Sequence, residues 1–449
     1  MTKHNLLTLI ALILLSINAK SQETNFNDSN YSSLESRVSK AESDLSFWKK
    51  LKINGWVQAQ YQQTDTVGAS SVAGGNFQPN TDNRLMLRRG RIKFTYEQAW
   101  AQYVLQFDVI DPTLTAPLNS STAPSATNTI PFAVNVRDFF VKINAPFWTP
   151  LSLTVGMQNR PFGFEIGQSS QHRETPERSR FTQMLFPNER DMGAMITLQA
   201  PKTSPLHIVK INAGVFNGSG IAREFDSKKD FIGQIILNNS TKNEKWQYGL
   251  GLSYYYGGTV QTDSTVYNSI SNNTYTKDYN VSNIGSYAKR EYFGVDAQVS
   301  YDNRFGITTL RGEYVQGTQP GSASSSRSFE ITPVGAMYVR EFNAGYFYFI
   351  HKIARLPIQL VFKYDFYDPN TKVEGNQITS TGKFGVGDIK YTTQGYGINY
   401  LASNNVKFMF YYDMITNETT GLYDGKANGT NYTYDKKDNI FTARVQYRF

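Results

Sequence analysis

The segment Ile358-Gln359-Leu360-Val361-Phe362-Lys363-Tyr364-Asp365-Phe366 decides the fold, because large apolar residues occupy every second position. Three of the four residues between them are Gln, Lys and Asp. Successive side chains of a β-strand point to opposite faces, so this pattern predicts a strand with one apolar and one polar face. The same alternation recurs at 53–62 and 101–109. Such strands suit the wall of a barrel that has hydrocarbon outside and water inside.

The alternation recurs along most of the chain. About sixteen segments show it, and each is about 8 to 14 residues long, as tilted transmembrane strands require. They begin near residues 53, 84, 100, 134, 151, 192, 208, 230, 246, 290, 306, 334, 357, 390, 405 and 439. We therefore expect an all-β fold, a transmembrane antiparallel β-barrel of about 16 strands over residues 53–449.

The connections between these segments alternate in length. Short links lie near 97–99, 144–150, 201–206, 238–245, 302–305, 351–356 and 402–405. Long polar links lie near 64–83, 111–133, 159–190, 217–229, 257–289, 317–332, 368–389 and 416–438. Short periplasmic turns and long extracellular loops are typical of outer-membrane barrels. With both termini periplasmic the strand number is even, and sixteen strands leave an aqueous lumen.

The composition agrees with a barrel and excludes other classes. The 449 residues include 29 Tyr and 29 Phe, yet the mean hydropathy is −0.44. After the N-terminus no apolar run reaches the roughly 20 residues of a membrane helix. The chain has no cysteine, which excludes disulfides, a lipid-modified cysteine and thiol chemistry.

The N-terminal 52 residues read as export and linker segments. Lys3 and His4 precede an apolar run at 6–15 and small residues up to Ala19, which predicts a cleaved signal peptide at 1–19, with a membrane anchor as the alternative. Residues 20–52 form a polar periplasmic linker that ends in a short helix. In this helix, apolar residues follow the heptad spacing of a coiled coil, although a solvated single helix also fits: Leu34, Val38, Ala41, Leu45 and Trp48.

The charge suggests the kind of partner. The formal net charge of +8 would become +7 once the signal, with Lys3, is removed. A basic protein can bind nucleic acid, but an exported, strand-rich chain favours anionic solutes and lipopolysaccharide. We expect no nucleic-acid partner, no cofactor and no metal.

The last strand carries an assembly signal. Phe441, Ala443, Val445, Tyr447 and the terminal Phe449 alternate with polar residues. A final aromatic residue on the lipid face resembles the signal that the outer-membrane barrel assembly machinery recognises, and Tyr447 and Phe449 are its candidates. The alternative is a soluble strand that happens to end in Phe.

The second strand supplies the first candidate site. With Gly90, Ile92 and Phe94 on the lipid face, its cations face the lumen: Arg89, Arg91 and Lys93. A cation on the lipid face would cost roughly 2–4 kcal/mol at the midplane. Stacked cations would let an anion pass from one to the next. Alternatively, these cations face an acidic loop and only create a transverse field.

The third long loop supplies the second candidate site. Its length and aromatic content suit a loop that folds into the pore and constricts it. Its charges balance: Arg160, Arg173, Arg178, Arg180 and Arg190 against Glu165, Glu174, Glu177, Glu189 and Asp191. We therefore expect ion pairs within the loop, so that selectivity depends more on the wall.

Other wall positions add a modest excess of positive charge, which predicts a preference for anions. The cations are Lys142, Lys210, Arg311, Lys363, Lys407, Arg444 and Arg448, and the acids are Asp108, Asp138, Asp296, Glu313, Asp365 and Asp413. Of these, Lys142 joins Arg89, Arg91 and Lys93 as a candidate anion contact.

Several motifs resemble those of the phosphate-selective porin O and P family. They are RRGRIKF (88–94), VGMQNRPFGFE (155–165), ERSR (177–180) with LFPNERDMG (185–193), GVFNGSG (214–220) and RVQYRF (444–449). The resemblance covers roughly 53–449. It implies trimeric sixteen-stranded barrels, some of which select phosphate through stacked arginines and a lysine cluster. Arg89, Arg91 and Lys93 match the basic wall strand, but the third loop carries no lysine for the lysine cluster.

Other functions fit less well. A barrel enzyme needs a strand-borne His near Ser or Asp, and the four His lie in the signal, the third loop and near periplasmic turns. No His pair has metal-ligand spacing. A structural or docking barrel would conduct no ions. The main alternative is a general diffusion porin that is non-selective or passes sugars.

Overall fold

The computed structural model describes residues 39–40, 42, 45–46, 48–110, 133–381, 383–423 and 431–449. The predicted signal peptide, most of the linker and the link at 111–132 lie outside these residues. The chain divides into two units, Met1–Lys49 and Lys50–Phe449. In the first unit, Leu45 and Trp48 are helical and exposed. The other three heptad positions lie outside the described residues, so the coiled coil stays a prediction. No helix in the described part of the chain is long and apolar enough to cross a membrane.

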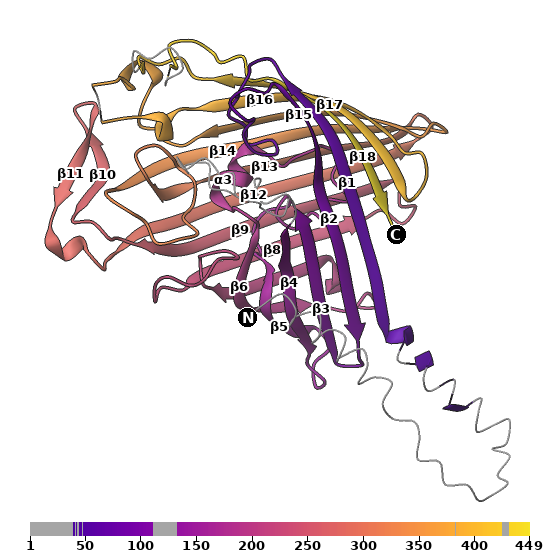
Figure 1. Ribbon diagram of the computed structural model, residues 1–449. Helices are drawn as coiled ribbons and strands as arrows, with labels where there is room; N and C mark the ends of the chain where they lie inside the picture. Colours follow the sequence, from indigo (N-terminus) through magenta and orange to yellow (C-terminus); the bar gives the residue numbers. More distant parts are fainter. Residues whose placement is uncertain are drawn as a thin grey trace, which may run out of the picture. The chain divides into compact units, whose positions relative to one another are not determined.

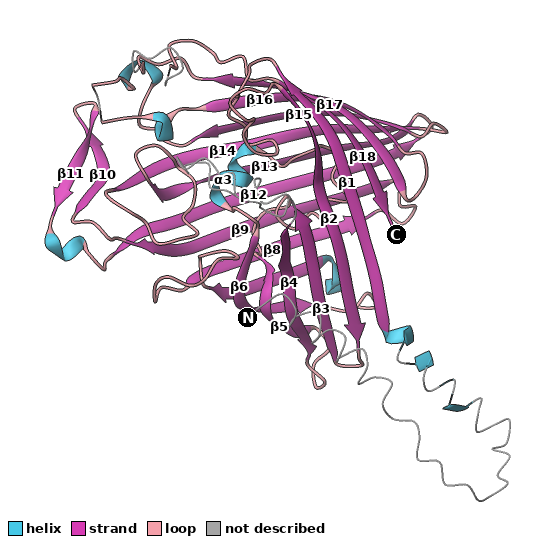
Figure 2. Cartoon of the chain, in the orientation of Figure 1, coloured by secondary structure: helices cyan, strands magenta, loops and turns pink. Residues whose placement is uncertain are grey.

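The second unit is built of antiparallel strands (Figures 1 and 2). Its strands are β1 (Leu51–Thr64), β2 (Asn83–Glu97), β3 (Ala101–Ile110), β4 (Ala133–Asn144), β5 (Leu151–Asn159), β6 (Arg190–Gln199), β7 (Val209–Phe216), β8 (Asp230–Ser240), β9 (Trp246–Val260), β10 (Thr265–Ser271), β11 (Thr274–Tyr279), β12 (Tyr287–Asn303), β13 (Gly306–Gly321), β14 (Met337–Ile353), β15 (Ile358–Asp368), β16 (Tyr391–Tyr400), β17 (Val406–Asn417) and β18 (Ile440–Arg448). Its helices are α3 (Arg180–Leu185) and the 3-10 turns η2 (Pro205–Ile208), η3 (Val281–Asn283), η4 (Gly375–Gln377) and η5 (Val386–Asp388).

The sheet closes on itself. β1 pairs with β18 from Trp56 opposite Arg448 to Thr64 opposite Ile440. β9 pairs directly with β12, so the hairpin of β10 and β11 stands outside the ring. Of the eighteen described strands in the sheet, sixteen therefore form the wall. The predicted closed sixteen-stranded antiparallel barrel is confirmed.

Each predicted strand start lies within three residues of the observed one, and the alternation of short and long connections is confirmed. Two details were wrong. Five strands are longer than the expected maximum of 14 residues: β2 and β9 contain 15, β13 contains 16, and β12 and β14 contain 17. The outer end of β14 pairs with β10. The link at 257–289 also holds a hairpin. Its turn residues Asn272 and Asn273 both have positive φ, as a two-residue hairpin turn requires.

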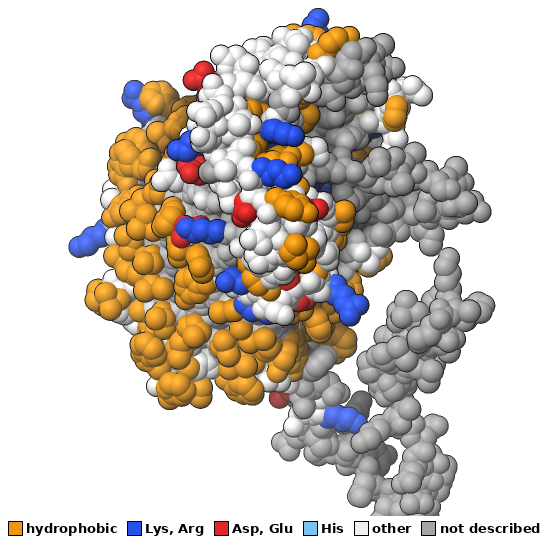
Figure 3. Space-filling model, turned by 90° about the vertical axis from the view of Figure 1, so that its left-hand side faces the viewer, with side chains coloured by type: hydrophobic (Ala, Val, Ile, Leu, Met, Phe, Trp, Pro, Cys, Tyr) orange, Lys and Arg blue, Asp and Glu red, His pale blue; other side chains and the backbone are white. Residues whose placement is uncertain are grey.

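The outer surface of the wall is apolar. Leu250, Phe293, Tyr314 and Phe347 are exposed on neighbouring strands, and Figure 3 shows hydrophobic side chains gathered over one side of the barrel. Exposing so large an apolar surface to water would be unfavourable. The alternation therefore places its apolar face outward, as the wall of a membrane barrel requires.

The interior is not uniformly polar. Phe162, Phe181 and Phe186 of the β5–β6 connection pack against inward-facing rings such as Tyr292 and Tyr346 in one buried cluster. This corrects the expectation of a lumen lined by polar side chains all round. The apolar cluster packs the loop against one part of the wall, and buried polar groups such as Arg311 and Glu313 also occur on the strands that supply this cluster.

Candidate functional site: the constriction loop and the basic wall

The connection between β5 and β6, residues 160–189, lies inside the barrel and contacts opposite sides of its wall. The backbone N–H of Phe164 donates to Glu313 of β13 at 3.1 Å. The indole of Trp56 in β1 donates to Ser170 Oγ at 3.1 Å. We call residues 160–189 the constriction loop, since any solute that crosses the barrel must pass it.

Glu177 anchors this loop to the basic side of the wall. Its carboxylate binds Arg88 at 2.8 Å and Arg89 at 2.7 Å from β2, and Arg444 at 2.9 Å from β18. Burial alone would raise the pKa of the Glu177 carboxyl, but the surrounding arginines outweigh it and hold that pKa well below its usual range. The carboxylate is therefore ionised, and it ties two wall segments together through the loop.

A β-bulge explains how two consecutive arginines reach one carboxylate. Gln58 of β1 lies opposite Arg89, but Ala59 lies opposite Leu87, so Arg88 is an extra residue in β2. A bulge places two successive residues against one partner, and here both guanidinium groups contact Glu177.

Sequence reasoning missed Arg88, although the sequence contains a signal. Outward apolar residues occupy odd positions at Leu85 and Leu87, but even positions at Ile92 and Phe94. This change of parity requires an extra residue between 87 and 92.

A second bulge, in β4, likewise adds an extra arginine that faces the lumen. Gln106 lies opposite Asp138 and Phe107 opposite Val136, so Arg137 is the extra residue. Arg137 forms ion pairs with Asp108 at 3.5 Å and with Glu189. Sequence reasoning missed Arg137 as well, and the bulge adds a second arginine to the same basic wall.

The wall cations that the sequence singled out differ in their surroundings. Arg89 and Arg91 are both 5% exposed, and Arg91 binds Asp108 at 2.8 Å. Lys93 and Lys142 are partly exposed nearer the short-turn end, and neither forms an ion pair with a described residue. Of the two alternatives for this wall, the contacts match arginines that face acidic groups rather than a ladder of free cations.

The expected ion pairs within the constriction loop form between Arg178 and Glu189 and between Arg173 and Glu177, but most of the loop's ion pairs join it to the wall. Glu174 binds Arg311 of β13 at 3.1 Å. Glu189 binds Arg178 within the loop, but also Arg137 and Arg190 of the strands. The loop lies against the wall, so the carboxylates reach wall cations as readily as their own neighbours.

The remaining predicted loop residues stabilise the loop or lie elsewhere. The Glu165 carboxylate accepts hydrogen bonds from Ser179, Thr182 and Tyr348. Arg160 donates to the Pro187 carbonyl at 2.9 Å. Asp191 accepts from the Gly218 N–H, and Arg190 binds Asp138 at 2.8 Å. Arg180 lies over the ring of Tyr391 and forms no ion pair with a described carboxylate.

Arg173 is the exception among the buried arginines. It is 2% exposed, and none of its three guanidinium nitrogens has a hydrogen-bond partner among the described residues. Its nearest carboxylate oxygen, on Glu177, is 3.9 Å away. Burial and the neighbouring charges of Arg178 and Arg89 lower the pKa of this guanidinium. The donors of Arg173 thus lie in a basic region where no described residue accepts a hydrogen bond from them.

The whole cluster carries an excess of positive charge. Among the described residues, eight arginines share four carboxylates within ion-pair distance. The arginines are Arg88, Arg89, Arg91, Arg137, Arg173, Arg178, Arg190 and Arg444, and the acids are Asp108, Asp138, Glu177 and Glu189. We call this set the arginine cluster. The described residues contain no group of three His, Cys, Asp or Glu side chains that could hold a metal.

Comparisons with known proteins yield likenesses of fold. No family model and no curated protein matches this chain. Similar solved structures include OmpT of Vibrio cholerae in its trimer form, with 10% identity, a TM-score of 0.46, and coverage of 89% of this chain and 99% of that one. The channel DcaP of Acinetobacter baumannii has 10% identity, a TM-score of 0.49 and coverage of 89% and 97%. OmpF of Salmonella typhi with daunomycin has 11% identity, a TM-score of 0.49 and coverage of 89% and 97%. At these identities the likeness concerns the fold alone.

Proposed function

We propose that this chain is an outer-membrane porin through which small hydrophilic solutes diffuse passively, with a preference for anions. Its support is the combination of a closed barrel, an apolar outer face and a constriction loop that carries an arginine-rich cluster inside the lumen. Sixteen strands enclose enough space for an aqueous path. The long connections and the short turns at opposite ends match a barrel inserted with its loops outside the cell.

The preference for anions depends on one observation, the unpartnered guanidinium of Arg173 within the arginine cluster. Leaving buried donors unpaired costs free energy, and a surplus of arginines adds repulsion between like charges. An anion that enters the cluster would accept those hydrogen bonds and offset the surplus charge. Anions therefore gain at the constriction an interaction that cations lack.

Phosphate is the candidate substrate within this class. A guanidinium presents its donors in a planar fork that matches two oxygens of a phosphate or carboxylate. Arg173 of the loop supplies such a fork without an acceptor among the described residues, whereas the forks of Arg89 and Arg91 are engaged by Glu177 and Asp108. The absence of lysine from the constriction loop distinguishes this site from the lysine cluster of the family it resembles.

An outer-membrane porin must also be exported, inserted into the membrane and assembled. Tyr447 and Phe449 are 51% and 54% exposed on the outer face, so that the barrel assembly machinery can reach both rings. We propose that the signal at 1–19 directs export, that the outer wall contacts lipid and lipopolysaccharide, and that the barrel is a homotrimer.

The test is the reversal potential of the purified protein in planar bilayers under a KCl gradient. Replacing Arg173→Ala should reduce the anion-to-cation permeability ratio and weaken the inhibition of chloride current by phosphate. Arg223→Ala, at an exposed arginine in the β7–β8 connection, is the matched control and should change neither. An unchanged ratio in Arg173→Ala would remove the support for anion preference, and a protein without conductance would contradict the porin function itself.

A further inference from the structure

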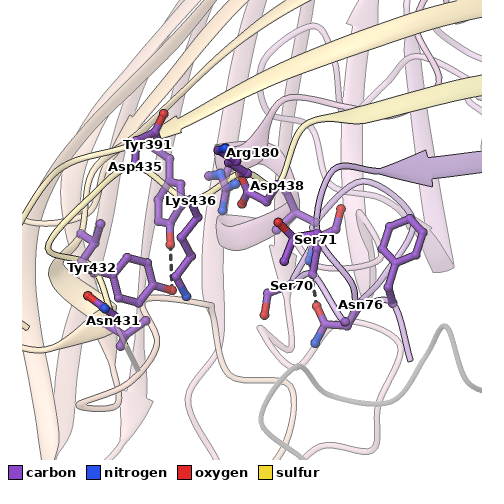
Figure 4. Close-up of a pocket in the computed structure, with 18 of the residues that line it drawn as sticks. Ser70, Ser71, Asn76, Arg180, Tyr391, Asn431, Tyr432, Asp435, Lys436 and Asp438 are labelled. Carbon is purple, nitrogen blue, oxygen red and sulfur yellow. Dashed lines mark hydrogen bonds between the residues drawn. The ribbon is translucent and has the colours of Figure 1, made fainter. Parts of the chain in front are cut away.

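A second polar site lies on the outer side of the constriction loop. It is a cavity of about 1370 Å³ between the β1–β2 connection, the end of the β17–β18 connection and helix α3. Figure 4 shows Arg180 of α3 beside Asp438, with Tyr432 and Lys436 on one side of this pair and Ser70, Ser71 and Asn76 on the other. We call it the outer cavity. It is larger than the roughly 300–1,000 Å³ of most small-molecule pockets, so it can hold a solute of several rings.

The charges of the outer cavity are nearly balanced, unlike those of the arginine cluster. The charged residues that line it are Arg180, Lys436, Lys437, Asp435 and Asp438. Arg180 lies 3.8 Å from the ring centroid of Tyr391, and Lys436 lies 3.8 Å from that of Tyr432. Cations held over rings in this way are already stabilised. The outer cavity therefore offers little to attract a free anion.

Asp438 and Arg180 lie side by side, and each has a buried polar atom that lacks a hydrogen-bond partner among the described residues. Asp438 is 7% exposed, and in the part of the chain that the structure describes neither its Oδ1 nor the Nε of Arg180 has a hydrogen-bond partner. The two groups stand next to each other in Figure 4, yet among the described ion pairs none joins them. A buried polar atom without a partner is costly, so a bound group that both donates and accepts would be favoured here.

Tyrosine rings provide the apolar part of the cavity. Tyr423 and Tyr434 are 47% and 56% exposed, and both line the cavity. The hydroxyl of Tyr391 donates to that of Tyr432 at 3.2 Å. Further hydroxyl and amide groups come from Ser70, Ser71, Asn76, Ser324, Ser325 and Asn431. The lining thus alternates rings with groups that both donate and accept hydrogen bonds.

We propose that the outer cavity is a docking site for neutral polyhydroxylated solutes, that is, oligosaccharides. A pyranose has an apolar face of C–H groups that stacks on an exposed tyrosine ring. Its hydroxyls each donate and accept, which satisfies Asp438 and Arg180 together. An inorganic anion would leave the rings and the volume unused, and an apolar ligand would leave the polar groups unpaired. The site lies apart from the arginine cluster, so it adds a second solute class to the proposed porin.

The test uses the full-length protein in planar bilayers with maltohexaose on the loop side. Wild-type channels should show reversible interruptions of the current. In Asp438→Asn and in Tyr434→Ala, the concentration for half-block should rise about tenfold, which corresponds to about 1.4 kcal/mol, while the unitary conductance persists and shows that the barrel is folded. Tyr279→Ala removes an exposed tyrosine on β11 outside this cavity and should leave the block unchanged.

Three results would overturn the proposal. They are a wild-type channel that maltohexaose does not block, a block that Asp438→Asn and Tyr434→Ala leave unaltered, and a block that inorganic phosphate relieves by competition. The last result would show that the sugar binds at the arginine cluster and not in the outer cavity. These three outcomes concern block by the sugar, whereas the anion preference is tested by the reversal potential of Arg173→Ala, so a failure here is distinct from a failure of the anion preference.

Discussion

Glu177 in the constriction loop and Arg444 in β18 form an ion pair of 2.9 Å, although they lie 267 residues apart in the chain. Arg444 also donates to the carbonyl of Pro176 at 2.7 Å. The last strand of the barrel therefore holds the loop that narrows it. The same carboxylate reaches β2 through Arg88 and Arg89, so a single side chain links the loop to both flanks of β1.

Glu177→Gln should loosen the constriction loop and strengthen the preference for anions. The substitution removes the only carboxylate within ion-pair distance of Arg88, Arg89 and Arg444 among the described residues. Breaking a buried ion pair from one side typically costs about 3–5 kcal/mol. We expect noisier single-channel currents and a reversal potential shifted toward that of chloride.

The control for Glu177→Gln is Glu341→Gln. Glu341 is exposed and forms a surface ion pair with Lys372 at 3.2 Å, so its loss should leave both the noise and the reversal potential unchanged. A Glu177→Gln channel that is as quiet and as selective as wild type would show that Glu177 does not hold the loop.

The bulge in β2 can be tested by cysteine labelling, because the chain has no cysteine of its own. Arg88→Cys and Arg89→Cys should both react with a charged, membrane-impermeant thiol reagent and change the current, since both side chains face the lumen. Ile92→Cys is exposed on the outer face and should not change the current. Strict alternation without a bulge predicts the opposite result for Arg88→Cys, namely no effect on the current.

Asp388→Asn should loosen the outer loops while leaving the barrel wall intact. Asp388 of η5 accepts hydrogen bonds from Arg340 at 2.8 Å, Tyr275 at 2.6 Å and Asn370 at 2.7 Å. Loss of this buried pair should cost about 3–5 kcal/mol locally. We expect faster protease cleavage in the β10–β11 hairpin with unchanged conductance. Asp278→Asn, at an exposed position of β11, should not speed the cleavage.

The pH dependence of this contact has a definite sign. Burial opposes ionisation of Asp388, but Arg340 and the hydrogen bonds outweigh it and lower the pKa of this carboxyl. A carboxyl with a lowered pKa in the folded state contributes stability above its ordinary pKa, and the contribution is lost as the pH falls through the lowered value. Wild-type loops should therefore become protease-sensitive only in strong acid, whereas Asp388→Asn should be sensitive at neutral pH.

Asp438 should make the outer cavity respond to pH near neutrality. Burial raises the pKa of its carboxyl to about 6, with Asp435 adding to the effect and Arg180 and Lys436 opposing it. A raised pKa means that the ionised form is unfavourable above that pH and that protonation relieves the cost as the pH falls. The cavity thus loses a negative charge between about pH 7.5 and about pH 5.

The measurement is the reversal potential at about pH 7.5 and at about pH 5. Wild-type channels should become more selective for anions on acidification, and Asp438→Asn should already show part of that shift at neutral pH and a smaller step between the two. Lys437→Gln removes a neighbouring positive charge and leaves Asp438 in place, so its step should equal that of the wild type. An equal step in Asp438→Asn would assign the titration to another group.

Much of the barrel could be predicted from the sequence, because its cause is local and repeats. Each wall strand meets hydrocarbon on one side, so the preference for apolar residues at alternate positions acts on every strand alike. The segment Ile358–Phe366 shows it in nine residues, and the observed strand β15 begins at Ile358. The hairpin of β10 and β11 was missed because it stands outside this wall and its pattern is that of a polar loop.

The arginine cluster was only partly predictable. Arg89 and Arg91 follow from alternation alone, but Arg88 and Arg137 reach it through bulges. A bulge is defined by the register between two strands, so one strand read by itself gives at most a hint of it. The pairing of the loop carboxylates with the wall was missed for a related reason, since charges that are balanced within a segment do not tell which partners the fold brings close.

By itself, the sequence determined that the chain forms a closed β-barrel with sixteen wall strands and loops sorted by length, because hydrophobic burial acts on each segment independently of its partners. Only the tertiary structure decided which arginines share Glu177, why Arg173 has no acceptor, and how Arg180 comes to stand beside Asp438. Those contacts join residues from distant strands and loops, and the Coulomb and hydrogen-bond interactions that define them act only over the short distances that folding creates.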